Sequence, residues 1–383
     1  MYQRFLQESK ESYFLFGPRG TGKTTWLHIL HPEALWIDLL VPELERELMN
    51  KPERLLARME ASPSKKTVII DEVQKVPALL NVVHSSIETK KGYQFVLTGS
   101  SSRKLKHTGS NLLGGRAQKK TMHPLMATEM GPDFDLDTAL WKGMLPLLVP
   151  FEEPKPILEG YISLYLKEEI QTEGLVRHLD QFSRFLEVIS FSHGSILNTT
   201  NIARECEVKR STVENYIAIL EELLLAYKIP VFTKRAARHL TAHPKFYLFD
   251  TGVFQSLRPK GPLDRPQEID GTALEGLVAQ HLVAWCDYRK TQTSVYFWRT
   301  RGDLEVDFIV YGETDFFAVE VKNTKKVFPQ DTKALNAFLK DYPEAKAFLL
   351  YRGSDCLQFG QVLCCPVSIF LQNLHPYRDL EFN

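Results

Sequence analysis

The residues with the clearest chemistry lie in the stretch FLFGPRGTGKTT, residues 14–25. Gly17 is followed by four residues and then by Gly22, Lys23 and Thr24, which is the Walker A spacing. Glycines let backbone N–H groups turn inward, and a helix starting near Lys23 adds partial positive charge, so the loop can hold an anion. Lys23 then reaches the β- and γ-phosphates, and the Thr24 hydroxyl binds Mg²⁺. The expected nucleotide-binding residues are Gly17, Pro18, Arg19, Gly20, Thr21, Gly22, Lys23, Thr24 and Thr25.

An acidic motif downstream completes this site. Residues 68–70, Val-Ile-Ile, have the character of a buried strand, and they are followed by Asp71 and Glu72. This is the Walker B arrangement, in which Asp71 holds Mg²⁺, usually through water, and Glu72 polarises the attacking water. Adjacent Asp-Glu is typical of the ATPase branch of P-loop folds. The pair therefore predicts a catalytic Glu72 and hydrolysis of ATP rather than binding alone.

Two further residues are candidates for contact with the γ-phosphate. The run YQFVLTGSSSR, residues 93–103, predicts a strand between the two Walker strands, so its polar end faces the phosphate. Ser100 is the expected sensor, with Thr98 or Ser101 as near alternatives and a plain Gly-Ser turn as the other interpretation. Arg116 follows two glycines beyond this strand, where it is either a surface arginine or an arginine finger. A finger implies a homo-oligomer with ATP between subunits.

The last third of the chain carries a second set of charged residues. Its pattern predicts a helix over 272–288, three strands, a helix near 329–340 and a strand over 346–351. The second strand holds Asp307, and the third holds Glu320 and Lys322 two residues apart, which is the skeleton of PD-(D/E)xK nucleases. Alternation along a strand places Glu320 and Lys322 on one face. Asp307 and Glu320 can then share a second divalent metal, with Lys322 orienting water and Glu275 adding a carboxylate. The alternative is the same fold without cutting activity.

Between these regions, residues 181–252 have the pattern of a winged-helix domain. Apolar spacing predicts a helix near 182–189, and Asn198 or Thr199 begins a helix-turn-helix with its second helix over 211–225. The loosely alternating stretch 228–249 resembles the wing. Beyond Lys228, its basic residues, with no acid among them, are Lys234, Arg235, Arg238 and Lys245. These residues suggest contact with DNA phosphates, whereas the acidic second helix fits a protein-docking role equally well.

Composition sets the limits of these interpretations. The chain has 383 residues, of which 44% are hydrophobic, and its 47 basic and 47 acidic residues cancel. Any DNA contact must therefore come from local patches. The start of the chain has no signal-peptide core and no apolar run approaches the roughly 18 residues of a membrane span, so we expect a cytoplasmic protein. The five cysteines form no CxxC pair, which favours reduced thiols over zinc.

The expected fold class is α/β. We expect a P-loop ATPase domain with an AAA-type parallel sheet over residues 1–125 and a helical lid or connector over 126–180. A winged-helix domain over 181–252 and a restriction-endonuclease-like α/β domain over 265–383 follow.

Taken together, the motifs resemble the AAA-type ATPases of bacteria and archaea that join a P-loop domain to a C-terminal domain of uncharacterised function. The resemblance rests on GPRGTGKTT, IIDEVQKVP, LTGSSSR, TALEG, WRTRGDLEVDFIV and FAVEVKN. It implies ATP binding and hydrolysis. The chain departs from the family pattern at residues 143–146, where a glycine pair is common, and at Lys167-Glu168, where Arg-Asp-like residues are common.

Two functions follow from these expectations. One is an ATP-driven enzyme that acts on DNA and cuts it with Asp307, Glu320 and Lys322. The other is a nucleotide-switched regulatory or protein-interaction module with an inert nuclease-like fold.

Overall fold

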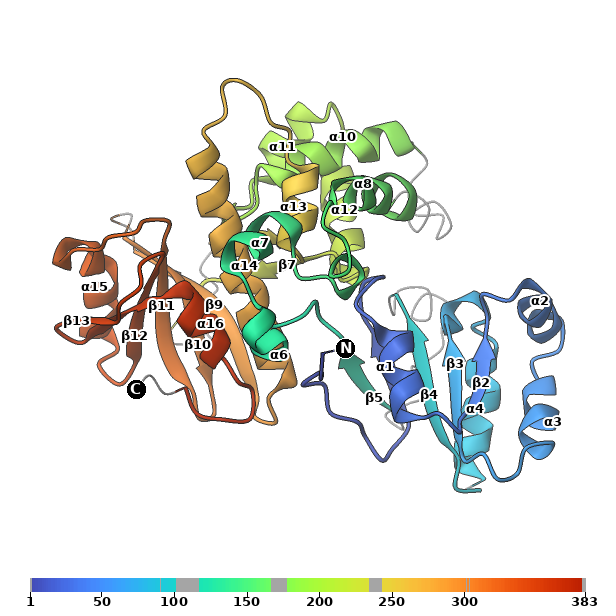
Figure 1. Cartoon of the computed structure of the whole chain (residues 1–383). Helices are drawn as coiled ribbons and strands as arrows, with labels where there is room; N and C mark the ends of the chain where they lie inside the picture. The colour runs from blue at the N-terminus through green and yellow to red at the C-terminus, as the bar shows by residue number, and fades with distance from the viewer. Residues whose placement is uncertain are drawn as a thin grey trace. The chain divides into compact units, whose positions relative to one another are not determined.

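The computed structural model describes residues 2–89, 91–100, 117–166, 178–233, 243–300, 302 and 304–380 (Figure 1). The chain divides into two compact units. Unit 1 comprises Met1–Phe5, Pro124–Ala218 and Ala226–Asn383, and unit 2 comprises Leu6–His123 and Ile219–Leu225.

Unit 2 is built on a five-stranded sheet in the order β2-β3-β4-β1-β5, and every pairing is parallel. Such strands are buried on both faces and read as continuous apolar runs, as YFLF in β1 does. The predicted position of β4 between the two Walker strands is confirmed. The strands are β1 (Tyr13–Phe16), β2 (Leu35–Asp38), β3 (Thr67–Asp71), β4 (Gln94–Gly99) and β5 (Gln118–Thr121). The helices are α1 (Lys23–Leu30), α2 (Pro42–Asn50), α3 (Arg54–Glu60) and α4 (Leu79–Glu88).

Unit 1 begins with a helical segment over residues 127–166. The elements that follow it come in the order helix, strand, helix, helix, strand, strand. Asn198 begins α11, as predicted, because its side chain accepts the N–H of Asn201 at 3.1 Å. The strands form an antiparallel sheet in the order β6-β8-β7. The first helices are α6 (Ala127–Met130), α7 (Leu136–Lys142), α8 (Lys155–Gly160) and the π-helix η5 (Tyr161–Leu166). The later elements are α10 (Leu179–Ser190), β6 (Ser195–Ile196), α11 (Thr199–Glu205), α12 (Arg210–Glu222), β7 (Ala226–Ile229) and β8 (Lys245–Leu248), and the part of α12 from Ile219 onward is counted with unit 2.

Gly143 fixes how α7 packs against α13. It has φ 83°, and a Cβ there would lie 2.2 Å from Asp250 Oδ1, so only glycine fits. Asp250 in turn accepts the N–H of Met144 at 2.7 Å and caps α13 through Val253. The segment 143–146 lacks the glycine pair of the family pattern but has the one glycine, Gly143, that this contact needs. Lys167 and Glu168, the other departure, lie outside the described residues.

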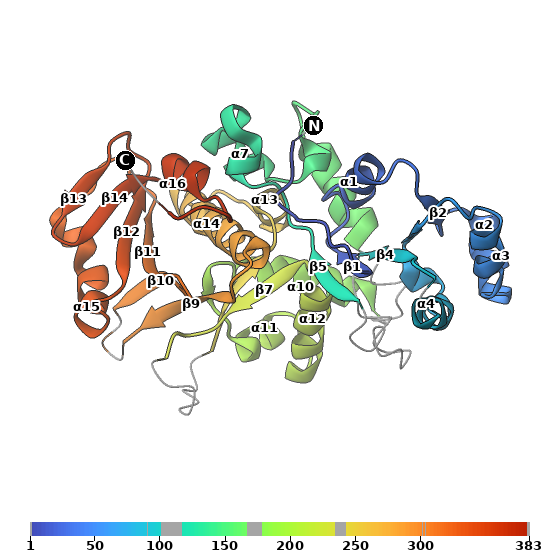
Figure 2. The same ribbon diagram turned by 90° about the horizontal axis from the view of Figure 1, so that it is seen from below.

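The second sheet of unit 1 has the order β13-β14-β12-β11-β10-β9. The predicted order α-β-β-β-α-β is observed as α14, β9, β10, β11, α15 and β12, with β13, β14 and α16 added. Helices α15 and α14 lie on opposite faces of this sheet (Figure 2). Leu335 and Phe338 of α15 belong to the core on one face, and Trp285 of α14 packs on Phe317 on the other. The elements are α13 (Thr251–Leu257), α14 (Pro266–Tyr288), β9 (Thr293–Arg299), β10 (Glu305–Gly312), β11 (Phe316–Lys322), α15 (Lys333–Asp341), β12 (Lys346–Tyr351), β13 (Leu357–Phe359), β14 (Val362–Pro366) and α16 (Val367–Asn373).

Candidate functional sites

The Walker A loop is shaped by its glycines. Gly20 and Gly22 have φ 83° and 88°, a region that side chains other than glycine rarely adopt. A Cβ on Gly17 would lie 2.4 Å from the carbonyl oxygen of Met122, so β5 passes too close for any side chain. Helix α1 begins directly after Gly22, which places its positive end at the loop. The loop thus has the backbone and the helix terminus of an anion site.

Lys23 is buried and bound to this loop. Its Nζ donates to the carbonyl oxygens of Gly17 at 2.7 Å and Pro18 at 3.2 Å. The Thr21 hydroxyl also donates to Pro18, at 2.8 Å. These carbonyls hold the ammonium at the loop, where an incoming phosphate would offer stronger, charged acceptors.

The two predicted Mg²⁺ ligands lie in contact. The Thr24 hydroxyl donates to Asp71 Oδ2 at 2.9 Å, although the residues are 47 positions apart. The other oxygen, Asp71 Oδ1, accepts from the hydroxyl of Thr98. The same Thr98 oxygen accepts the backbone N–H of Glu72 at 3.3 Å. Thr98, a near alternative to Ser100 in the sequence, is therefore the residue of β4 that bridges both Walker B acids.

Glu72 has a strained backbone, with φ 57° in the left-handed region. Such a conformation costs a non-glycine residue about 1–3 kcal/mol and is concentrated at functional sites. The side-chain amide of Gln74 donates to the Glu72 carboxylate and also to Ser100 Oγ, the latter at 3.4 Å. Gln74 connects the predicted base to the predicted sensor. The sequence pattern did not identify it, and its only signal is the position two residues after Glu72. Arg116 and Ser101 lie outside the described residues.

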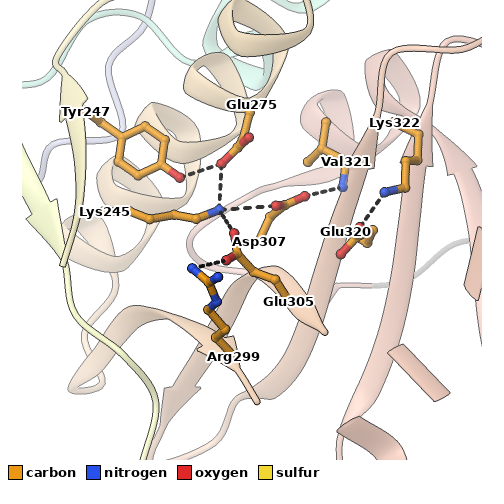
Figure 3. Close-up of polar contacts among 9 residues, drawn as sticks. All are labelled: Lys245, Tyr247, Glu275, Arg299, Glu305, Asp307, Glu320, Val321 and Lys322. Carbon is orange, nitrogen blue, oxygen red and sulfur yellow. Dashed lines mark hydrogen bonds and ion pairs between the residues drawn. The ribbon is translucent and has the colours of Figure 1, made fainter. Parts of the chain in front are cut away.

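In unit 1, three carboxylates contact a buried lysine and a fourth, Glu320, lies beside them next to Lys322 (Figure 3). We call the four the carboxylate cluster: Glu275, Glu305, Asp307 and Glu320. Lys245 Nζ lies 2.7 Å from Glu305 Oε1, 3.0 Å from Glu275 Oε1 and 3.3 Å from Asp307 Oδ1. Tyr247, also from β8, donates its hydroxyl to Glu275 Oε1 at 2.7 Å. Lys245 is only 2% exposed, so its predicted role as a basic wing residue at the surface is wrong. Its side chain extends from β8 to α14 and β10 and cannot contact a DNA phosphate from there.

A β-bulge places Asp307 in this cluster. The pairing of β10 with β9 shifts between Val306 and Ile309, which allows Asp307 and Phe308 to oppose a single residue, Phe297. The N–H of Phe297 instead donates to Pro230 at 3.0 Å, in the segment that follows β7. The second oxygen of Asp307, Oδ2, accepts the backbone N–H of Val321 at 2.9 Å.

The predicted pair Glu320 and Lys322 does lie on one side of β11. Lys322 Nζ contacts Glu320 Oε1 at 2.6 Å, whereas Glu320 Oε2 is buried with no hydrogen-bond partner among the described residues. Glu305 was missed by the sequence reasoning, although its position two residues before Asp307 in one strand is a usable signal. Glu275 joins the cluster through Lys245 and Tyr247.

The electrostatics of the cluster follow from burial and crowding of charge. Burial, and then the charge of Asp307, raises the pKa of Glu275 and of Glu320 above their ordinary values. For Lys245, burial opposes the charged form, but Asp307, Glu275 and Glu305 together outweigh it and raise its pKa. The ammonium is the favoured state of Lys245 in this setting.

These residues do not fit a divalent metal as they are arranged. Both oxygens of Asp307 have donors, and a lysine ammonium lies among the carboxylates that would bind the ion. Across the described ranges, no three His, Cys, Asp or Glu side chains converge as metal ligands would. The metal expected between Asp307 and Glu320 is therefore not supported by this geometry.

Comparison with protein families assigns the ATP-site region. Residues 9–131 match the family described as an AAA domain, and these residues are thus an AAA-type P-loop domain. Residues 133–264 and 270–370 match two domains of unknown function, DUF8612 and DUF4143 respectively. In the ranges that the structure describes, no helix has the length and apolar character needed to cross a membrane.

Similar proteins extend over most of the chain. An uncharacterised protein of Mycobacterium tuberculosis is 25% identical over 348 residues, covering 88% of this chain and 76% of that one. One from Haemophilus influenzae is 23% identical over 214 residues, covering 51% of this chain and 53% of its own. A solved structure of the replication initiator DnaA, bound to AMPPCP and single-stranded DNA, is 16% identical and covers 57% of this chain and 84% of its own. Its TM-score of 0.29 is too low to support an inference.

Proposed function

We propose that this protein is an Mg²⁺-dependent ATPase. The observation that carries the proposal is the contact of Thr24 with Asp71 beside the glycine-rich Walker A loop. A hydroxyl and a carboxylate are the oxygen ligands that Mg²⁺ prefers, and P-loop enzymes bind the ion through this pair. Bound Mg²⁺ would supply charge neutralisation for the phosphates.

The protein groups have separate roles in this mechanism. On nucleotide binding, Lys23 exchanges its carbonyl acceptors for the β- and γ-phosphate oxygens, which gives charged hydrogen bonds of about twice the strength. Glu72 accepts a proton from, or orients, the water that attacks the γ-phosphorus in line with the leaving oxygen. Gln74 holds the Glu72 carboxylate, and Ser100 lies within reach of the same amide. Thr98 keeps Asp71 and Glu72 in register.

The decisive experiment for hydrolysis compares Glu72→Gln with the unchanged chain. The substitution keeps the shape of the side chain and removes the base, so turnover is expected to fall by about 10²–10⁴-fold. Affinity for ATP, measured with a fluorescent analogue, is expected to stay within a few-fold. Unchanged hydrolysis with purified Glu72→Gln protein would remove Glu72 from this role.

We further propose that unit 1 is a nucleotide-responsive regulatory or protein-interaction module rather than a metal-dependent nuclease. The supporting observation is that Lys245 is ion-paired with Glu275 and Asp307, two of the carboxylates predicted for the nuclease site, and with Glu305 beside them. Binding of DNA by unit 1 has less support. Arg210 at the start of α12 is paired with Glu214 at 2.8 Å, and the basic residues Lys234, Arg235 and Arg238 lie outside the described residues.

A cleavage assay separates the two functions. The full chain and Asp307→Ala are incubated with plasmid and single-stranded DNA and Mg²⁺ or Mn²⁺, with and without ATP. We expect no cutting by either protein. Cutting that Asp307→Ala abolishes would overturn the regulatory proposal, and equal cutting by both would identify a contaminating nuclease.

A further inference from the structure

Lys245 has an unusual position for a lysine in a sheet that is partly exposed. It is the first residue of β8, where it pairs with Ile196 and Ile229, and its side chain leaves this sheet. Taking an ammonium out of water is unfavourable unless charged partners replace the lost hydration. Here three carboxylates from two other elements, α14 and β10, supply that replacement (Figure 3).

The geometry around Nζ is that of a bound cation. Carboxylate oxygens of Glu275, Glu305 and Asp307 lie at 2.7–3.3 Å from one point. Divalent cations bind the same kind of ligand at about 2.0–2.6 Å, so these carboxylates are too far apart for a metal as arranged and would have to move inward to bind one. Without the ammonium, the three carboxylates would face one another with no compensating charge at their centre.

A second observation points to a missing ligand beside this ring. Glu320 is 6% exposed, its Oε1 is held by Lys322, and its Oε2 is buried without a partner among the residues described. Buried polar atoms in native proteins almost always have a partner, so an orphan of this kind calls for an explanation. A carboxylate suited to bind a cation leaves an oxygen unpaired in this way when the cation at its neighbours is the ammonium of Lys245, which contacts the other three acids.

We propose that Lys245 acts as a resident cation, occupying the position in the carboxylate cluster that a divalent metal would take. The lysine thereby joins β8 to α14 and β10 and excludes metal from the cluster. This goes beyond the proposed ATPase function and does not depend on it, because no residue of the P-loop site is involved. It gives a physical reason for a nuclease-like arrangement of acids that is inert.

The test is Mn²⁺ binding to the full chain without nucleotide, measured by electron paramagnetic resonance. Lys245→Met nearly keeps the volume of the side chain, shortens it by its terminal atom and removes its charge. We expect it to gain one Mn²⁺ site per chain, with affinity at least about tenfold above any site of the unchanged protein, and a thermal unfolding temperature that rises with Mn²⁺. Adding Asp307→Asn to Lys245→Met should abolish the gain.

Lys228 provides the matched control. It is an exposed lysine on β7 of the same three-stranded sheet, so Lys228→Met removes one positive charge without entering the cluster. The Lys228→Met chain should bind Mn²⁺ as the unchanged chain does. If it gained an Mn²⁺ site as Lys245→Met does, the loss of one positive charge would explain the gain, and the proposal would be contradicted.

A folded Lys245→Met chain without an added Mn²⁺ site would overturn the proposal. If Lys245→Met does not fold, Lys245→Met combined with Glu305→Gln removes one carboxylate along with the ammonium and so lowers the repulsion. That chain keeps Glu275, Asp307 and Glu320 and should still gain the site. Its failure to bind Mn²⁺ when folded would equally overturn the proposal.

Discussion

At the scale of single residues, the side chains of the proposed ATP site are already held in place. Lys23 already lies at the loop, but its acceptors are neutral carbonyls that a phosphate can replace. Asp71 is held from two sides, by Thr24 and by Thr98, so its oxygens are oriented before any ion arrives. Preorganisation of this kind reduces the cost of binding at the moment of reaction.

Replacing Lys23 by alanine tests the phosphate contact. Loss of charged hydrogen bonds to the phosphates should weaken ATP binding by at least about tenfold, from about 1.5–3 kcal/mol for a hydrogen bond to a charged group. Isothermal titration with ATP and Mg²⁺ measures the loss. Lys51→Ala, an exposed lysine after α2, is the control and should bind ATP normally. Retained affinity in Lys23→Ala would contradict the Walker A assignment.

Thr98→Val tests the bridge between the two acids. Valine has the shape of threonine but leaves Asp71 Oδ1 and the Glu72 N–H without their partner. We expect about 1–3 kcal/mol lower stability from the unsatisfied groups and about 10–100-fold slower hydrolysis, the usual effect of removing a partner of a metal ligand.

Thr98→Ser restores the hydroxyl and should recover most of the activity. Thr67→Val provides the comparison, because Thr67 lies at the opposite end of β3 from Asp71 and its hydroxyl donates to Gln94 Oε1 at 3.2 Å. Equal hydrolysis rates for Thr98→Val and the unchanged chain would show that the bridge has no role in positioning the acids.

At the scale of elements, two buried histidines connect segments of unit 1. His281 of α14 accepts the N–H of Ala127 at the start of α6 at 2.9 Å. His193, which precedes β6, accepts the N–H of Leu248 in β8 at 3.0 Å. An imidazole can accept these bonds only while it is neutral. Burial accordingly lowers the pKa of His281 to about 4 and of His193 to about 3.

This arrangement predicts loss of stability in acid. Between the unfolded pKa near 6.5 and the lower folded values, the unfolded chain binds protons that the folded chain does not. The free energy of unfolding should therefore fall as pH falls below about 6.5, by up to about 1.4 kcal/mol per pH unit for each histidine. The stabilisation is fully present above that pH.

His281→Gln isolates one share of this effect, because its side-chain oxygen can accept the Ala127 N–H without titrating. Urea unfolding at several pH values between 7 and 4.5 should give a shallower slope for the variant. The comparison between chains is needed because burial raises the pKa of Asp250 to about 6, which acts in the opposite direction. Parallel slopes for the two proteins would contradict the neutral-histidine account.

At the scale of the whole molecule, ATP hydrolysis is proposed to be completed by a second copy of the chain. Arg116 follows the sensor strand in sequence, and an arginine there can reach the γ-phosphate of a neighbour. In that case Arg116→Ala chains have an intact pocket without a finger, and Lys23→Ala chains have a finger without a pocket. Mixing the two inactive proteins should restore hydrolysis, by roughly 10³-fold over either alone where the pair assembles. Mixtures that stay inactive although they assemble by size-exclusion chromatography would exclude a role in trans.

The sequence by itself was enough to predict the proposed ATP site, because the residues of that site are encoded locally. A loop of glycines, the start of α1 and the tips of parallel strands have fixed relations once β1, β3 and β4 pair, so their spacing specifies the chemistry. The order of the elements in the second sheet was also readable from alternation and helical spacing.

Only the tertiary structure decided what the acids of unit 1 are doing. Lys245 lies 30 residues from Glu275 and 62 from Asp307 in sequence, and its neighbours along the chain suggest a basic surface. Whether a lysine meets solvent or carboxylates depends on where its strand is placed, and no local pattern encodes that. The bulge at Asp307 and the packing of β8 beside α14 and β10 bring the charges together, and burial then favours their pairing. The sequence pattern of these acids predicts metal binding, whereas in the folded chain the ammonium of Lys245 lies among them.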